Sequence, residues 1–290
     1  MHILQLPQVI ASSGWLIAIG AMLAGCQPAD TSNAAGDNLV EDSVVNLPAA
    51  VAPVVPMERE AILLAVAKAA SARAAGVDDA AVQRQLEGRP FEFSIRFGCS
   101  GAAKDLRSAA LGWSYQPDQE TLRLRATPTI TADDPLAAMI GGEAVEAIEG
   151  FWVPLPWLLE AGCPAVVTES AEPAEPDALG DQAAKGEVGT GVRPPKVGIA
   201  QFFTRSDART RRRDRRAYEA VIAVEPGSPV GSKGFDLVLS GRLRPLPGKR
   251  VIECIAATID LPPDCIVTAD IDEVRMERPE DGNVLARWSS

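Results

Sequence analysis

The heptapeptide FEFSIRF, residues 91–97, alternates strictly between large apolar and polar side chains. This period of two predicts a β-strand with one buried face, because successive side chains of a strand point to opposite sides. Its buried face would carry Phe91, Phe93, Ile95 and Phe97. The segment TLRLRA, residues 121–126, repeats the pattern with leucines on one face and Arg123 and Arg125 on the other. Both segments predict strands of a half-buried sheet.

Towards the N-terminus the pattern changes to that of a helix. After Pro56, the segment MEREAILLAVAKAASARAAG contains mostly good helix formers, with acidic residues in its first turn and Gly76 at its end. These features predict a helix that stops at Gly76. We expect a second, short helix to be capped by Asp78 or Asp79 and to run to about Leu86.

Towards the C-terminus six strand-like segments follow one another without helical patterns between them. They are VGIAQFF from Val197, YEAVIAV from Tyr218, FDLVLSGRL from Phe235, VIECIAATI from Val251, CIVTADI from Cys265 and VLARW from Val284. Turn residues separate them, so we expect antiparallel pairing in a sandwich-like or barrel-like body. The fold class predicted for the whole chain is α+β, with short N-terminal helices before a mostly antiparallel, β-rich body.

The amino terminus predicts export. No charged residue occurs between Val9 and Gly25, and the apolar segment Trp15 to Leu23 is shorter than the roughly 20 residues of a membrane-spanning helix. It ends in Leu23-Ala24-Gly25-Cys26, which resembles the lipobox of bacterial lipoproteins. The resemblance implies that residues 1–25 are a signal peptide, removed after Cys26 has received a diacylglycerol, and that the new amino group is acylated. One departure is MHILQLPQ, which lacks the Lys or Arg that usually opens such leaders.

The lipoprotein resemblance also implies a location, while composition and residue patterns suggest a domain plan. Gln27, in place of an aspartate, favours the outer membrane, with the protein lipid-anchored in the cell envelope and facing the periplasm. We expect residues 26–55 to form a flexible tether, residues 56–169 an α+β region and residues 197–290 a β-rich region. Residues 170–196, rich in Pro, Glu and Gly, are predicted to be an exposed loop or linker. The sequence leaves open whether these regions form one domain or two.

Four cysteines follow Cys26, namely Cys99, Cys163, Cys254 and Cys265. An even number in an oxidising compartment predicts two disulfides, for which the sequence permits three pairings. The short segment IAATIDLPPD between two strand-like segments favours Cys254 with Cys265, and Cys99 with Cys163 then follows. A zinc site is the alternative interpretation, but the chain has no Cys-x-x-Cys motif.

The composition restricts the chemistry. His2 is the only histidine and lies in the predicted leader, so the mature chain has none for a Ser-His-Asp triad, a Cys-His pair or a histidine-ligated metal. We therefore expect no cofactor and no metal. The net charge of −11 argues against nucleic acid as a partner, because its phosphates would be repelled.

Seven arginines fall between Arg205 and Arg216 in this acidic chain. On a helix, Arg205, Arg209, Arg212 and Arg216 would share one side, with Arg213 beside them; a long loop between two strands is the alternative. Guanidinium groups bind phosphates and carboxylates bidentately, so these five residues are candidates for anion binding. The competing interpretation is a solvated face, or arginines paired with the chain's own Asp and Glu.

Two tryptophans of the segment EGFWVPLPWLLEAGCP, Trp152 and Trp157, are candidates for stacking on sugars or contacting a partner protein. Packing in the core beside Cys163 is the alternative for this segment. The many acidic residues match no calcium loop and single out no catalytic pair, so we expect solvated carboxylates. They include Asp133, Asp134, Glu143, Glu146, Glu149, Asp270, Asp272 and Glu273.

These observations together predict a membrane-anchored envelope lipoprotein that binds or scaffolds something. Its expected contacts are the membrane, through the lipid anchor, and an anionic envelope polymer, a lipid headgroup or an acidic protein. The alternative is an envelope hydrolase that uses carboxylates to act on glycan or peptide.

Overall fold

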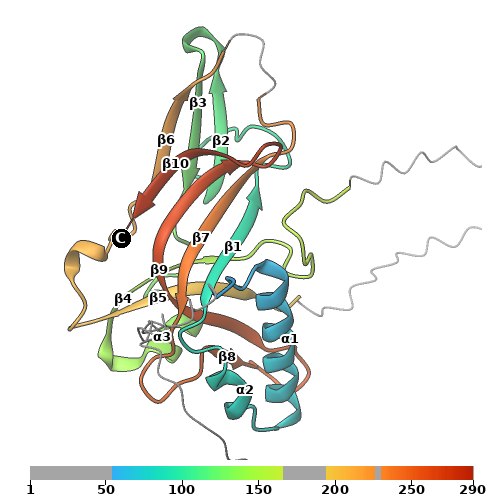
Figure 1. The fold of residues 1–290 in the computed structure, drawn as a ribbon, viewed down its shortest axis with the longest axis vertical. Coiled ribbons are helices and arrows are strands. Elements are labelled where there is room, and N and C mark those ends of the chain that lie inside the picture. The colour runs from blue at the N-terminus through green and yellow to red at the C-terminus, as the bar shows by residue number, and fades with distance from the viewer. Residues whose placement is uncertain (1–53, 166–193, 226–229, 290) are drawn as a thin grey trace, which may run out of the picture. The chain divides into compact units, whose positions relative to one another are not determined.

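The computed structural model describes residues 54–165, 194–225 and 230–289. The predicted leader, Cys26, nearly all of the tether and most of the 170–196 segment lie outside the described residues. The described chain has the α+β fold that the sequence predicts, with mostly antiparallel sheets and few helices (Figure 1).

The two predicted helices are present. Helix α1 (Arg59–Ala75) ends at Gly76, whose φ of 66° is the left-handed conformation that glycine adopts without strain. Helix α2 (Ala80–Arg84) is short, and Asp78 accepts the N–H of Ala80 at 3.0 Å. Helix α1 packs against strands β1 (Pro90–Phe97), β8 (Ile252–Ile255) and β9 (Asp264–Arg278). Its buried residues are Ile62, Leu63, Val66 and Ala69. Helix α1 therefore covers part of the sheet (Figure 1).

The larger sheet has the strand order β1-β7-β9-β5-β4, and β8 and β10 also pair with β9. Only the β5–β9 pair is parallel among the described strands. The bounds are β1 (Pro90–Phe97), β4 (Val145–Trp152), β5 (Val197–Thr204), β7 (Phe235–Leu243), β8 (Ile252–Ile255), β9 (Asp264–Arg278) and β10 (Asn283–Ser289).

Strand β9 organises this sheet because it changes partners along its length. Its first residues lie between β5 and β8, whereas its later residues lie between β7 and β10. The register with β7 shifts between Ser240 and Gly241, where β9 contains one extra residue, Asp272, and this bulge accompanies the change. A Cβ at Gly241 would lie 2.0 Å from the carbonyl oxygen of Asp270, so the bulge requires glycine there. Figure 1 shows β9 as the long, curved red strand.

A second, three-stranded sheet consists of β2 (Leu111–Gln116), β3 (Thr121–Ala126) and β6 (Tyr218–Ala223), in the order β2-β3-β6. Leu122 and Leu124 of β3 face inward, as the alternation predicts, and belong to the same apolar core as Phe93 of β1. Tyr218 of β6 packs edge-on against Trp288 of β10, with ring centroids 5.3 Å apart. The two sheets therefore share one core.

Strands from both sides of the 166–193 segment pair with each other. Strand β1 pairs with β7, β3 pairs with β6, and β4 pairs with β5. Neither half of the described chain forms its sheets from its own strands alone.

The remaining elements are helix α3 (Pro135–Gly141) and the 3-10 turns η1 (Pro117–Gln119), η2 (Gly142–Ala144) and η3 (Arg209–Arg211). The sequence interpretation missed α3, β2 and most of β4. It also extended the strand from Val251 beyond Ile255, where β8 ends, and stopped the strand from Cys265 seven residues before the end of β9. The charged residues of β9 concealed its length, because many of them pair with arginines on or beside the sheet.

Both predicted disulfides are present: Cys99 is bonded to Cys163, and Cys254 to Cys265. The second joins facing residues of β8 and β9. The first fixes the turn after β1 to the segment after β4, which are 64 residues apart. The turn that contains Cys99 is closed by a 3.0 Å backbone hydrogen bond from Gly101 to Gly98.

Candidate functional site

The arginine-rich segment, residues 205–216, is a loop between β5 and β6. A single 3-10 turn, Arg209–Arg211, is its only regular structure, and Asp214 and Arg215 have φ values of 52° and 65°. The helical alternative is therefore wrong and the loop alternative is right. Two successive left-handed residues end any helix, and arginines at helical spacing would repel one another.

A buried carboxylate fixes this loop. Oε1 of Glu149, on β4, accepts the backbone N–H of Arg213 at 2.7 Å and that of Asp214 at 2.8 Å. The Glu149 side chain belongs to a residue only 8% exposed, and burial raises its pKa although the two N–H groups favour the ionised form. Glu149 thus holds the turn where Asp214 enters the left-handed conformation.

The expectation of a solvated Glu149 is therefore wrong. Its position in β4 places it on the same strand face as Phe151, which is 2% exposed and part of the core. The alternation EAIEGFW contains that signal, because residues two apart share a face. The sequence interpretation missed it because it did not predict a strand over Val145–Trp152.

Two candidate arginines are used inside the protein. The Arg212 side chain is 9% exposed, donates to Glu146 Oε2 at 2.9 Å and to the Thr204 carbonyl at 2.8 Å, and lies over the Phe203 ring. The Arg213 guanidinium lies 4.2 Å from the centroid of the Tyr218 ring and donates to the Ala217 carbonyl at 3.1 Å. These contacts support pairing with the chain's own groups for both residues.

The other three candidates, Arg205, Arg209 and Arg216, are exposed; we call them the outer arginines. The Arg205 side chain is 89% exposed and reaches Glu146 only at 3.4 Å. The Arg209 side chain makes no hydrogen bond or ion pair with the described residues. The Arg216 guanidinium donates only through its Nε, to the Arg213 carbonyl at 2.9 Å. Their guanidinium groups retain donors that could bind an anion.

The two candidate tryptophans have different surroundings. The indole N–H of Trp152 donates to Asp134 Oδ2 at 3.3 Å, and the Lys196 ammonium lies 5.5 Å from its ring centroid. Trp157 follows β4 and is 61% exposed. The core interpretation therefore describes Phe151 but not Trp157.

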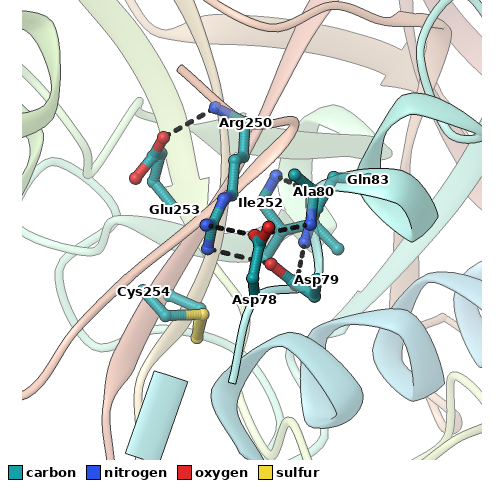
Figure 2. A network of polar contacts seen from close by, with 9 residues as sticks. Asp78, Asp79, Ala80, Gln83, Arg250, Ile252, Glu253 and Cys254 are labelled. Atoms are coloured by element: carbon teal, nitrogen blue, oxygen red, sulfur yellow. Dashed lines mark hydrogen bonds and ion pairs between the residues drawn. A yellow bond between two sulfur atoms is a disulfide. The ribbon is translucent and has the colours of Figure 1, made fainter. Parts of the chain in front are cut away.

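A polar network around Arg250 joins α2 to the segment before β8. Figure 2 shows its guanidinium directed at two carboxylates, Asp79 at 2.8 Å and Asp78 at 3.1 Å. Gln83 extends the network, since it donates to Asp79 at 2.9 Å and accepts the N–H of Ile252 at 3.0 Å. Each of these groups has a partner within the fold, so we interpret the network as a structural clamp that holds α2 to the segment before β8.

Acidic residues of β9 are also engaged by arginines. Asp270 pairs with Arg244 at 2.8 Å, and Glu273 pairs with Arg275 at 2.8 Å. Within residues 54–165, 194–225 and 230–289, no group of three or more His, Cys, Asp or Glu side chains is arranged to hold a metal ion. None of the helices in the described chain is long and apolar enough to cross a membrane.

The arginine loop is thus the strongest candidate site from the sequence, reduced from five residues to the three outer arginines. Comparison with known proteins adds nothing to this assignment, because no family model, no curated protein and no solved structure matches the chain.

Proposed function

We propose that this chain is an envelope lipoprotein that binds anionic groups of the cell envelope through the outer arginines. The observation that carries the proposal is the contrast within one loop: Arg212 and Arg213 are consumed by internal contacts, whereas Arg205, Arg209 and Arg216 are exposed. Three exposed arginines within one loop of a chain of net charge −11 are a local exception that suits phosphate or carboxylate ligands.

The anchoring of the loop supports this role. Because Glu149 holds the backbone of Arg213 and Asp214, the loop is ordered before any ligand arrives. Binding then costs less conformational entropy than it would for a loose basic segment. A lipid on Cys26 would keep the loop near the membrane and its attached polymers.

Binding to isolated envelope polymers tests the arginine part of the proposal. The full chain, extracted from membranes in mild detergent, would be sedimented with peptidoglycan sacculi, which offer carboxylates, and with lipopolysaccharide micelles, which offer phosphates. We expect Arg205→Gln/Arg209→Gln/Arg216→Gln to bind at least about tenfold more weakly than wild type, with a reduced salt dependence.

The matched control carries Arg73→Gln, Arg84→Gln and Arg89→Gln, three exposed arginines at other places on the surface. It changes the net charge by the same amount. Equal binding by the two triple variants would show that only overall charge matters, and the proposal for the loop would fail.

The lipid anchor has a separate test. Intact-mass measurement of the membrane-extracted protein should show a chain that begins at Cys26 and carries acyl groups. A Cys26→Ser variant should retain its leader and carry no acyl group. An unmodified mass for the wild-type protein would contradict the anchor and leave the arginine proposal standing.

A further inference from the structure

A second basic site lies on the outer face of the three-stranded sheet. The strand register places Ser114 of β2 opposite Arg123 of β3, and Arg123 opposite Val221 of β6. Two residues further along β3, Arg125 lies opposite Glu219 of β6. Since side chains two apart share a face, Arg123 and Arg125 point to the side opposite the buried Leu122 and Leu124.

The segment between β1 and β2 turns this face into a trough. A Cβ on Gly112 would lie 3.2 Å from Leu106 and 3.0 Å from Ala109, so the segment lies against the sheet at Gly112. It is held there by the N–H of Ala103, which donates to the Trp113 carbonyl at 2.8 Å. Asp105, Leu106 and Arg107 then form one wall of a trough of about 390 Å³. That volume falls within the usual range of small-molecule sites, about 300–1,000 Å³.

The charged groups of the trough differ in whether they have a partner. Arg125 pairs with Glu219, and Asp105 accepts the N–H of Arg107 at 3.0 Å within its own turn. Arg107 and Arg123 are exposed, and the side chains of both make no hydrogen bond or ion pair within the described part of the chain. Two guanidiniums that form no hydrogen bond or ion pair with the described residues therefore line a concave surface, which Ser114 and Gln116 also line.

We propose that this trough binds an acidic saccharide, a hydroxylated ring that carries a phosphate or a carboxylate. Arg107 and Arg123 would bind the oxyanion, because a guanidinium donates two parallel hydrogen bonds to such a group. Ser114, Gln116 and the carboxylates of Asp105 and Glu219 would bind sugar hydroxyls, which both donate and accept. The site shares no residue with the outer arginines and does not depend on the lipid anchor.

Calorimetric titration of the full chain in detergent tests the proposal. The probes are glucose 6-phosphate, glucuronate, glucose and inorganic phosphate. We expect at least one of the two sugar acids to bind at least about tenfold more tightly than glucose or phosphate. Arg123→Gln and Arg107→Gln should each weaken that binding about tenfold, because each removes a charged hydrogen-bonding group.

Arg84→Gln, an exposed arginine on α2, is the matched control and should bind as wild type does. Selective binding of glucose 6-phosphate or of glucuronate would support the site and assign its acid. Equal affinity for inorganic phosphate and the sugar acids would overturn it in favour of a plain anion site. Equal affinities of Arg123→Gln and Arg84→Gln would remove the trough from binding altogether.

The variant without the outer arginines separates the two proposals. It should retain wild-type affinity for the sugar acids even if its binding to envelope polymers is lost. Loss of sugar-acid binding in that variant, with Arg123→Gln unaffected, would place the ligand at the loop and overturn the trough.

Discussion

Oε1 of Glu149 accepts the backbone N–H of Arg213 at 2.7 Å, across 64 residues of sequence. The same oxygen accepts the N–H of Asp214, where the chain enters the left-handed conformation. One buried carboxylate thus determines the path of the loop that exposes the outer arginines. The stability of this loop and its capacity to bind an anion are therefore linked.

Replacement of Glu149 by alanine should loosen the loop and destabilise the fold. The N–H groups of Arg213 and Asp214 would lose their acceptor in a partly buried position, and the loss of such an acceptor costs up to about 1–3 kcal/mol. We expect a decrease of that size in the free energy of urea unfolding. Amide exchange of residues 212–215 should also become faster. Glu143→Ala, at an exposed position in the same region, is the control and should change neither quantity.

The stabilisation from Glu149 should depend on pH. Burial raises its folded-state pKa above the unfolded value of about 4.3, so the folded protein binds a proton more tightly. The favourable contribution is fully present below the unfolded pKa and is lost as the pH rises through the folded-state pKa. Glu149→Gln does not titrate, so its stability relative to wild type should increase between pH 4 and pH 8. A difference independent of pH would contradict the raised pKa.

The sequence predicts those parts of the fold in which one residue pattern decides the structure. FEFSIRF and TLRLRA alternate cleanly, and both are strands with the predicted buried faces. The site was harder to predict. Arg209 and Arg212 are both arginines and lie three positions apart, yet one is exposed and the other is internal. The positions of Glu146 on β4 and of Phe203 and Thr204 on β5 make Arg212 internal. The residues next to Arg212 in the sequence do not indicate which distant residues it will contact.

Arginines of one loop should therefore differ in their effect on stability. Arg212→Ala removes the bonds to Glu146 and Thr204 and the contact with Phe203, and we expect a loss of about 2 kcal/mol. Arg209→Ala removes no bond to the described residues and should change stability by less than about 0.5 kcal/mol. Thermal unfolding, monitored by circular dichroism, compares the stabilities of these two variants. Similar losses for both variants would mean that the loop acts through its total charge.

The Arg250 network should contribute modestly to stability. The Arg250 side chain is 40% exposed and the Asp79 side chain is 14% exposed, so solvent partly screens this ion pair. A double-mutant cycle with Arg250→Ala and Asp79→Ala should give a coupling energy of about 1 kcal/mol. The pair Arg250→Ala and Glu143→Ala is the control and should show additive effects, because Glu143 is outside this network. No coupling between Arg250 and Asp79 would reduce the clamp to a surface contact.

The two disulfides should stabilise the protein to different extents. In the loop-entropy description, a bridge restricts the unfolded chain more when it joins more distant residues. Cys99 and Cys163 are 64 residues apart, whereas Cys254 and Cys265 are 11 apart. Replacing the first pair with alanine should therefore cost about 4 kcal/mol, against about 3 kcal/mol for the second. Urea unfolding of the two double variants measures the difference, and intact mass confirms that the remaining bridge has formed. A larger loss for the Cys254–Cys265 variant would show that packing of the buried sulfurs between β8 and β9 outweighs chain entropy.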